Sequence, residues 1–177
     1  MSIKVNNTLG ITVRDIANNR NIPYITVETV IKTYIADLIK SAENGERVVI
    51  DGLTSITVIR GSIKDYTTVK KSLPKRIRDI ALKKGITMKT VEYVIRDYLD
   101  SLIILAQNSE NIKVHGLTEI AVEPDATGEL VVRGKISPYL RSRLEMIGSG
   151  EFHLSGRVSH SLKKRVNDCH QDAVVLV

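Results

Sequence analysis

The chain has 177 residues, of which 42% are hydrophobic and 26% charged, and its formal net charge is +6. Its single cysteine excludes an internal disulfide framework, and it has no run of about 18 apolar residues that could cross a membrane. Because the first ten residues also lack a signal-peptide core, we expect an intracellular protein that is not secreted and contacts no membrane. The mild basicity favours an anionic partner.

A sequence repeat organises the first two thirds of the chain. The segment 26–58 recurs without a gap as 90–122, and 16 of the 33 aligned positions are identical. The similarity extends backwards, because residues 14–17 match residues 78–81 at the same offset of 64. Two units of roughly 60 to 65 residues bury only modest cores alone, so we expect them to pack against each other.

The elements expected in each repeat follow from the spacing of apolar residues. The leading segment 1–11 contains a candidate strand at 3–5, and a short helix and a turn follow it. Apolar residues at helical spacing then predict a longer helix, on whose stripe Tyr34 and Tyr98 are expected to pack rather than to stack on bases. After a polar break, a β-branched run turns at Gly-Leu-Thr, which predicts a β-hairpin.

A second, shorter repeat predicts a strand followed by a basic helix. Copies begin at Gly128 and Gly150, at an offset of 22, and a weaker copy begins at Gly61. A serine stands near each helix start as a candidate N-cap, with Pro74 and Pro138 inside the first turn. We expect the first two copies in chain order to complete the two units and the copy from Gly150 to be surplus.

The order of these elements resembles the HU/integration host factor family. Residues 84–87 are similar to the helix–helix turn of that family, 116–120 to its Gly-Phe-Gly-x-Phe signature, and 136–139 to the entry of its last helix. With the first copy, the resemblance covers residues 12–147. It implies an α+β fold in which two tandem units, each helix-helix-β-hairpin-strand-helix, form a fused pseudo-dimer.

The chain departs from that family in its β-arms. The arms of the family are long basic ribbons tipped by an intercalating proline, whereas the corresponding connections here are residues 59–65 and the acidic residues 123–129. Pro124 is expected to serve an ordinary turn. The arms should therefore be short or absent, and we expect no bending of duplex DNA by them.

The predicted domain boundaries follow from the two repeats. Residues 1–72 form the first unit and residues 73–148 the second. Residues 149–177 form an extra strand-helix element with an apolar C-terminal strand, which we expect to dock on a neighbouring subunit or another protein. The candidate docking residues are Phe152, Leu154, Leu162, Val166, Val174, Val175 and Leu176.

No pattern of catalytic residues stands out. The sequence has no glycine-rich phosphate loop, and Cys169 has no evident base. His153, His160 and His170 lie close to this cysteine in the chain, but their spacing matches no standard zinc site. We therefore expect a protein without enzymatic activity, cofactor or metal.

Basic side chains gather in residues 60–84 and 132–165. The candidate contacts for phosphate or for an acidic partner are Lys70, Lys71, Lys75, Arg76, Arg78, Arg141, Arg143, Lys163, Lys164 and Arg165. Such contacts would hold a nucleic-acid backbone without reading bases. A solvated face, or pairing with acidic surfaces on other copies of the chain, is an equally weighted alternative.

Two functions are consistent with these patterns. The first is a structural assembly protein, such as a head-to-tail ring or connector protein, because the tandem, armless chain resembles the integration host factor-like structural proteins of crAss-like tailed phages. Its partners would be further copies or other virion proteins, and it would reside in the phage particle. The alternative is a nucleoid-type architectural protein of the host cytoplasm that binds duplex DNA non-specifically through its basic helices.

Overall fold

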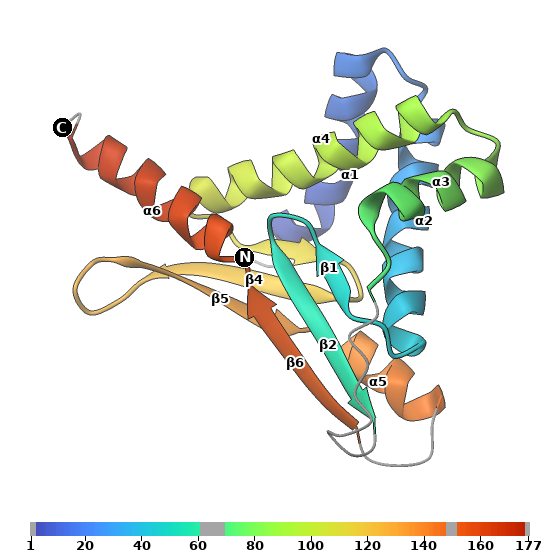
Figure 1. Ribbon diagram of the computed structural model, residues 1–177. Helices are drawn as coiled ribbons and strands as arrows, with labels where there is room; N and C mark the ends of the chain where they lie inside the picture. Colours follow the sequence, from blue (N-terminus) through green and yellow to red (C-terminus); the bar gives the residue numbers. More distant parts are fainter. Residues whose placement is uncertain (1–2, 61–69, 148–151, 176–177) are drawn as a thin grey trace.

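The computed structural model describes residues 3–60, 70–147 and 152–175, which form an α+β protein (Figure 1). Its helices are α1 (Ile3–Arg20), α2 (Tyr24–Glu43), α3 (Leu73–Lys84), α4 (Met88–Gln107), α5 (Pro138–Ile147) and α6 (His160–Val175). Its strands are β1 (Val48–Ile50), β2 (Thr54–Arg60), β3 (Ile112–Val114), β4 (Thr118–Pro124), β5 (Leu130–Ile136) and β6 (Phe152–Val158). The strand expected at residues 3–5 is wrong, because α1 already begins there.

Both copies of the long repeat form two helices and a hairpin, as predicted. The first copy gives α1, α2, β1 and β2, and the second gives α3, α4, β3 and β4. The predicted cap at Ser72 is confirmed, since its hydroxyl accepts a hydrogen bond from the Lys75 amide and a proline follows in the first turn. Gly85 ends α3 in the left-handed conformation, which favours glycine.

The core lies where the apolar stripes of α2 and α4 meet. The two helices contact each other, and the stripe positions on both are buried. Tyr34 and Tyr98, at equivalent positions of the repeat, lie inside this core, so the expectation that they pack is confirmed. Burial raises the pKa of both phenols. Neither ring is available to a nucleic-acid base.

The strands form two antiparallel sheets, and their order corrects the expected domain boundaries. The second sheet is β3-β4-β5, but the first is β1-β2-β6. The strand β6 runs beside β2 over seven residue pairs, from Thr54 opposite Val158 to Arg60 opposite Phe152 (Figure 1). The element after residue 149 is therefore not surplus: it supplies the third strand of the first sheet. The strand expected after Gly61 falls on residues 61–69, outside the described residues.

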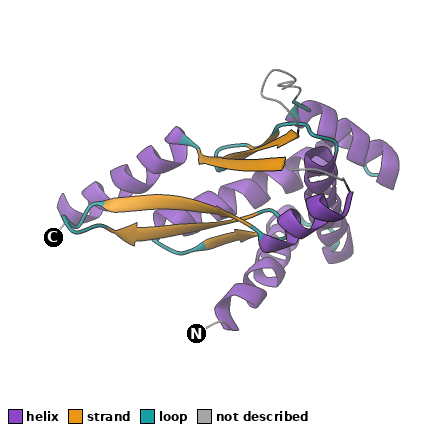
Figure 2. Ribbon diagram, turned by 90° about the horizontal axis from the view of Figure 1, so that it is seen from below, coloured by secondary structure: helices purple, strands orange, loops and turns teal. Residues whose placement is uncertain are grey.

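The helices α5 and α6 each follow the sheet of one half of the molecule and pack on the long helix of the other half. We call α1, α2 and the β1-β2-β6 sheet the first half, and α3, α4 and the β3-β4-β5 sheet the second. The helix α5 follows the second sheet but packs on α2, and α6 follows the first sheet but packs on α4. Strands β5 and β6 also contact each other, so the two sheets lie side by side among the helices (Figure 2). Each half therefore completes the core of the other.

Four of the predicted docking residues pack in the core of the chain itself. Leu162 and Val166 of α6 are fully buried, and Phe152 and Leu154 of β6 are half-buried against the core. Their expected role in docking on another molecule is therefore wrong, because the fold of the chain itself needs them. Val174 and Val175 lie in the last turn of α6 rather than in a strand, and Leu176 lies outside the described residues.

The Gly-Leu-Thr turns show how closely the halves approach. Gly52 and Gly116 both have φ of +78°, and a Cβ on either would lie 3.1 Å from an isoleucine side chain. For Gly52 this isoleucine is Ile103 on α4, and for Gly116 it is Ile39 on α2. Since these two isoleucines are equivalent in the repeat, each hairpin turn meets the long helix of the opposite half in the same way. A side chain at either glycine would be strained by the positive φ, and its Cβ would force the isoleucine to shift by a few tenths of an ångström.

Candidate anion-binding site

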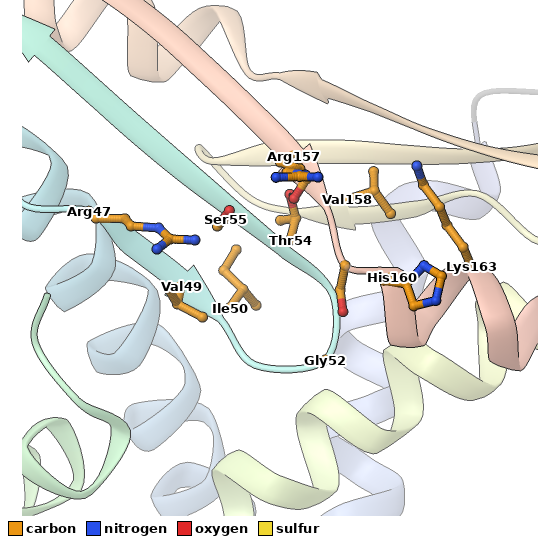
Figure 3. A pocket seen from close by; sticks show the side chains of 11 residues that line it. Arg47, Val49, Ile50, Gly52, Thr54, Ser55, Arg157, Val158, His160 and Lys163 are labelled. Carbon is orange, nitrogen blue, oxygen red and sulfur yellow. The ribbon is translucent and has the colours of Figure 1, made fainter. Parts of the chain in front are cut away.

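A basic cavity of about 390 Å³ lies between the first sheet and the start of α6 (Figure 3). Its lining residues are Arg47, Val49, Ile50, Gly52, Thr54, Ser55, Arg157, Val158, Ser159, His160 and Lys163. Three of them are cationic, and none is a carboxylate. Figure 3 shows Arg47 before β1, Arg157 on β6 and Lys163 on α6.

The pairing of β6 with β2 brings these side chains together. Arg157 lies opposite Ser55, so both project from the outward face of the sheet. The hydroxyl of Thr54 donates to the Arg157 carbonyl at 2.9 Å, which fixes the strand at this point. The Ser159 amide donates to the Leu53 carbonyl at 2.9 Å and so fixes the entry of α6. Without β6, only Arg47 of the three cations would remain beside the first hairpin.

The electrostatics of the cavity favour an anion. Arg47, Arg157 and Lys163 are exposed, and Lys163 stands in the first turn of α6, where unpaired backbone N–H groups add partial positive charge. Guanidinium groups and helix N-termini both suit phosphate oxygens. This arrangement can hold an anionic group by hydrogen bonds and charge.

The equivalent position in the second half is less basic. A cavity of about 380 Å³ there is lined by Lys135 and Arg141, which correspond to Arg157 and Lys163 in the short repeat. However, Lys135 lies opposite Glu119 in the sheet, and Glu119 also pairs with Lys113 at 3.7 Å. The carboxylate offsets the local cations, so the two halves present unequal charge. Neither cavity has a carboxylate in its lining, but the one in the first half has three cations and the one in the second half has two, beside which Glu119 lies on the same sheet.

The predicted contact residues divide into exposed and internally paired groups. Those exposed to solvent are Lys70, Lys75, Arg78, Arg141, Lys163, Lys164 and Arg165. Of these, Lys163 lines the basic cavity of the first half and Arg141 the one in the second. Arg143 is half-exposed but donates to Glu43 at 2.8 Å. The exposed group thus remains available to an external anion, although it is not gathered at one place.

The prediction that Arg76 contacts phosphate or an acidic partner is wrong. Its side chain is only 1% exposed, and its Nη1 donates to Asp37 at 2.7 Å and to Ser41 at 2.9 Å. Lys71 is also turned inward and bridges Asp37 and Asp79, at 3.0 and 2.7 Å. These two cations neutralise the chain's own carboxylates, so Arg76 cannot contact phosphate and Lys71 is already paired.

Sequence reasoning missed Arg47, Arg157 and His160 as members of one site. Arg157 was visible as the counterpart of Lys135 in the short repeat, but the repeat does not show which sheet it joins. Arg47 stands in the polar break before β1, more than a hundred residues away. Only the long-range strand pairing places them around one cavity.

Other kinds of site find little support in the described part of the chain. No group of three or more His, Cys, Asp or Glu side chains is placed there to hold a metal ion. The Cys169 thiol is free and exposed. Among these residues no helix combines the length and apolar character needed to span a bilayer. In comparisons with known proteins, no family model matches the chain and no curated protein matches it.

Proposed function

We propose that this chain is a non-enzymatic architectural protein that holds duplex DNA by its phosphate backbone, on a fused pseudo-dimer of the HU/integration host factor type. The observation that carries the proposal is the basic cavity of the first half, in which three cations from different elements surround a space without a carboxylate. Phosphate contacts of this kind position a duplex without reading its sequence.

The unequal halves limit how the duplex is held. The first sheet presents its cations freely, whereas Glu119 and Glu123 are exposed on the second. We therefore place the phosphate contacts mainly on the first half. This predicts weak, strongly salt-dependent binding.

The turn between β4 and β5 makes bending of the duplex implausible. The Asp125 carboxylate accepts hydrogen bonds from the backbone amides of Thr127 and Glu129, at 2.8 and 3.1 Å. The hydrogen bond from the Thr127 hydroxyl, together with these amides, lowers the pKa of Asp125 and keeps it charged. A tight, anionic turn replaces the basic ribbon that would follow a minor groove.

Replacing the three cations is expected to weaken DNA binding specifically. The variant Arg47→Ala/Arg157→Ala/Lys163→Ala should lower affinity about tenfold or more and reduce the slope of log affinity against log salt by about 2 to 3, because about one counterion is released per phosphate contact. Fluorescence anisotropy with a labelled random-sequence duplex measures both quantities. The same duplex, labelled at both ends, should keep its end-to-end distance when protein binds.

A matched control separates site from net charge. The variant Lys83→Ala/Lys84→Ala/Lys89→Ala removes the same charge at the α3–α4 turn, away from the cavity. It should bind nearly as the parent does. The proposal fails if the two variants lose affinity equally, or if the parent binds no duplex at low salt.

A structural assembly protein, for example a virion component between head and tail, is the second candidate. The surplus strand-helix element no longer supports it, since that element completes the first sheet. What favours it is the separation of charge on the surface, where an acidic groove between α1 and α4 lies apart from the basic cavity. Homo-oligomers or complexes with other virion proteins at low salt, without nucleic acid, would support this candidate. A chain that binds DNA but never associates would exclude it.

A further inference from the structure

An acidic groove lies between α1 and α4. It has a volume of about 520 Å³ and is lined by Thr12, Asp15, Ile16, Asn19, Arg20, Asp97, Asp100, Ser101 and Ile104. Arg20 pairs with Asp97 at 2.7 Å. Among the described residues, Asp15 and Asp100 have no ion-pair partner, and both are exposed. The groove therefore carries uncompensated negative charge.

The repeat places a corresponding groove between α2 and α3, and it contains Asp79, the equivalent of Asp15. There the Lys71 ammonium group donates to Asp79 at 2.7 Å and to Asp37 at 3.0 Å, and the remaining cavity is only about 140 Å³. The hydrogen bond from Lys71 lowers the pKa of Asp79. An ammonium group is thus the internal ligand at this place.

The first copy of the repeat has no lysine at the position equivalent to Lys71. The residue there is Asn7, and α1 is already helical at this point, whereas Lys71 precedes α3 and reaches back to the carboxylates. Of the two carboxylates that hold Lys71, Asp79 has its counterpart in Asp15, whereas Asp37 corresponds to Ser101, and the groove gains Asp100 where the other has Ala36. Among the described side chains, Arg20 pairs with Asp97 and no cation pairs with Asp15 or Asp100, so these two carboxylates are open to a basic group of another molecule.

The exposed face of α3 matches this groove in charge and in hydrophobicity. Lys75, Arg78 and Leu82 follow one another at helical spacing on the side of α3 opposite its buried residues. Leu82 is 78% exposed between these cations. In the groove, Ile104 is 55% exposed beside the carboxylates. Each surface thus offers one exposed apolar residue, which is flanked by cations on α3 and by carboxylates in the groove.

We propose that the α1/α4 groove binds the Lys75–Arg78–Leu82 face of α3 from a second copy of this chain. The two surfaces are different parts of the molecule, so the contact is head-to-tail, and an open row of copies keeps one free groove at one end and one free α3 face at the other. Such association yields closed rings or open filaments, according to the rotation between neighbours. The contact uses none of the residues of the basic cavity, so variants of one site leave the other intact.

Charge reversal tests the contact from both sides. Nucleic-acid-free parent protein is expected to associate with rising concentration at low salt in sedimentation velocity, and to dissociate as salt screens the pairs. Asp15→Lys/Asp100→Lys and Lys75→Glu/Arg78→Glu should each remain monomeric. Their equimolar mixture should associate again, because each reversed surface then meets its reversed partner.

Two further variants control for fold and for net charge. Glu110→Lys/Glu145→Lys makes the same change of charge as the groove reversal, at exposed positions outside the groove, and should associate as the parent does. Leu82→Ser leaves the charge unchanged and should weaken association about tenfold, because one leucine side chain loses its burial. Thermal melting should show that all variants fold.

Three results would overturn the proposal. One is a parent protein that stays monomeric throughout the micromolar range at low salt. Another is a pair of charge-reversed variants that still associate, and the third is a mixture of them that does not. None of these results depends on DNA, so failure here and failure of the DNA-binding proposal can be told apart.

Discussion

Deleting residues 149–177 is expected to unfold the chain rather than release a folded core. The deletion removes β6, and with it the third strand of the first sheet, together with Leu162 and Val166. Each of these two side chains contributes about 1.5–3 kcal/mol by burial, against a typical total stability of about 5–15 kcal/mol. Circular dichroism and thermal melting should show lost cooperativity. A truncated chain with the parent's melting transition would contradict the observed sheet order.

A point substitution tests the same packing with less disturbance. Leu162→Asp places an unpaired charge where α6 packs on α4, and it should destabilise the fold by several kcal/mol. Lys164→Asp introduces the same carboxylate two residues further along α6, at an exposed position, and should change stability by about 0.5 kcal/mol or less. Equal effects of the two substitutions would mean that α6 does not belong to the core.

Replacing Arg76 is expected to have the second largest effect. Arg76→Met should lower the free energy of unfolding by about 3 kcal/mol or more, because it leaves the Asp37 carboxylate with Lys71 alone and the Ser41 hydroxyl without its partner. The double variant Arg76→Met/Asp37→Asn should recover part of this loss, since no half-buried charge is then left in excess.

The neighbouring cation on α3 provides the control for this experiment. Arg78 is exposed, so Arg78→Met should change stability by about 0.5 kcal/mol or less in urea unfolding. If Arg76→Met behaves like Arg78→Met, Arg76 is a surface residue and its ion pair with Asp37 does not stabilise the core.

Local sequence patterns were enough to predict the hairpins and the helices, apart from the start of α1, but not the pairing of the sheets. The spacing of apolar residues is set by the helix or strand that carries them, so the stripes on α2 and α4 could be predicted directly. The strand-helix copies at 128 and 150 look alike, and nothing local assigns either one to a sheet. Chain proximity suggested that β6 was surplus, whereas Thr54 actually pairs with Val158, across more than a hundred residues.

The candidate site was only partly predictable for the same reason. Arg47 and Arg157 meet because β6 joins β1 and β2, which no single segment shows. Arg76 could have been questioned, because it stands four residues before Ile80 and beside Ile77, on the apolar side of α3. Its charge led to the prediction of an exposed side chain. In the fold, Arg76 is buried with its apolar neighbours, since Asp37 lies within reach to neutralise it.

A cross-link between β2 and β6 tests most directly the claim that the C-terminal strand completes the first half. Thr57 and Ser155 lie directly opposite each other, at a spacing that suits a disulfide, and Thr57→Cys/Ser155→Cys can be made with Cys169→Ser. Upon oxidation of the dilute protein, non-reducing electrophoresis should show one cross-linked species of monomer size at every concentration. Covalent dimers that increase with concentration, or no cross-link at all, would contradict the claim.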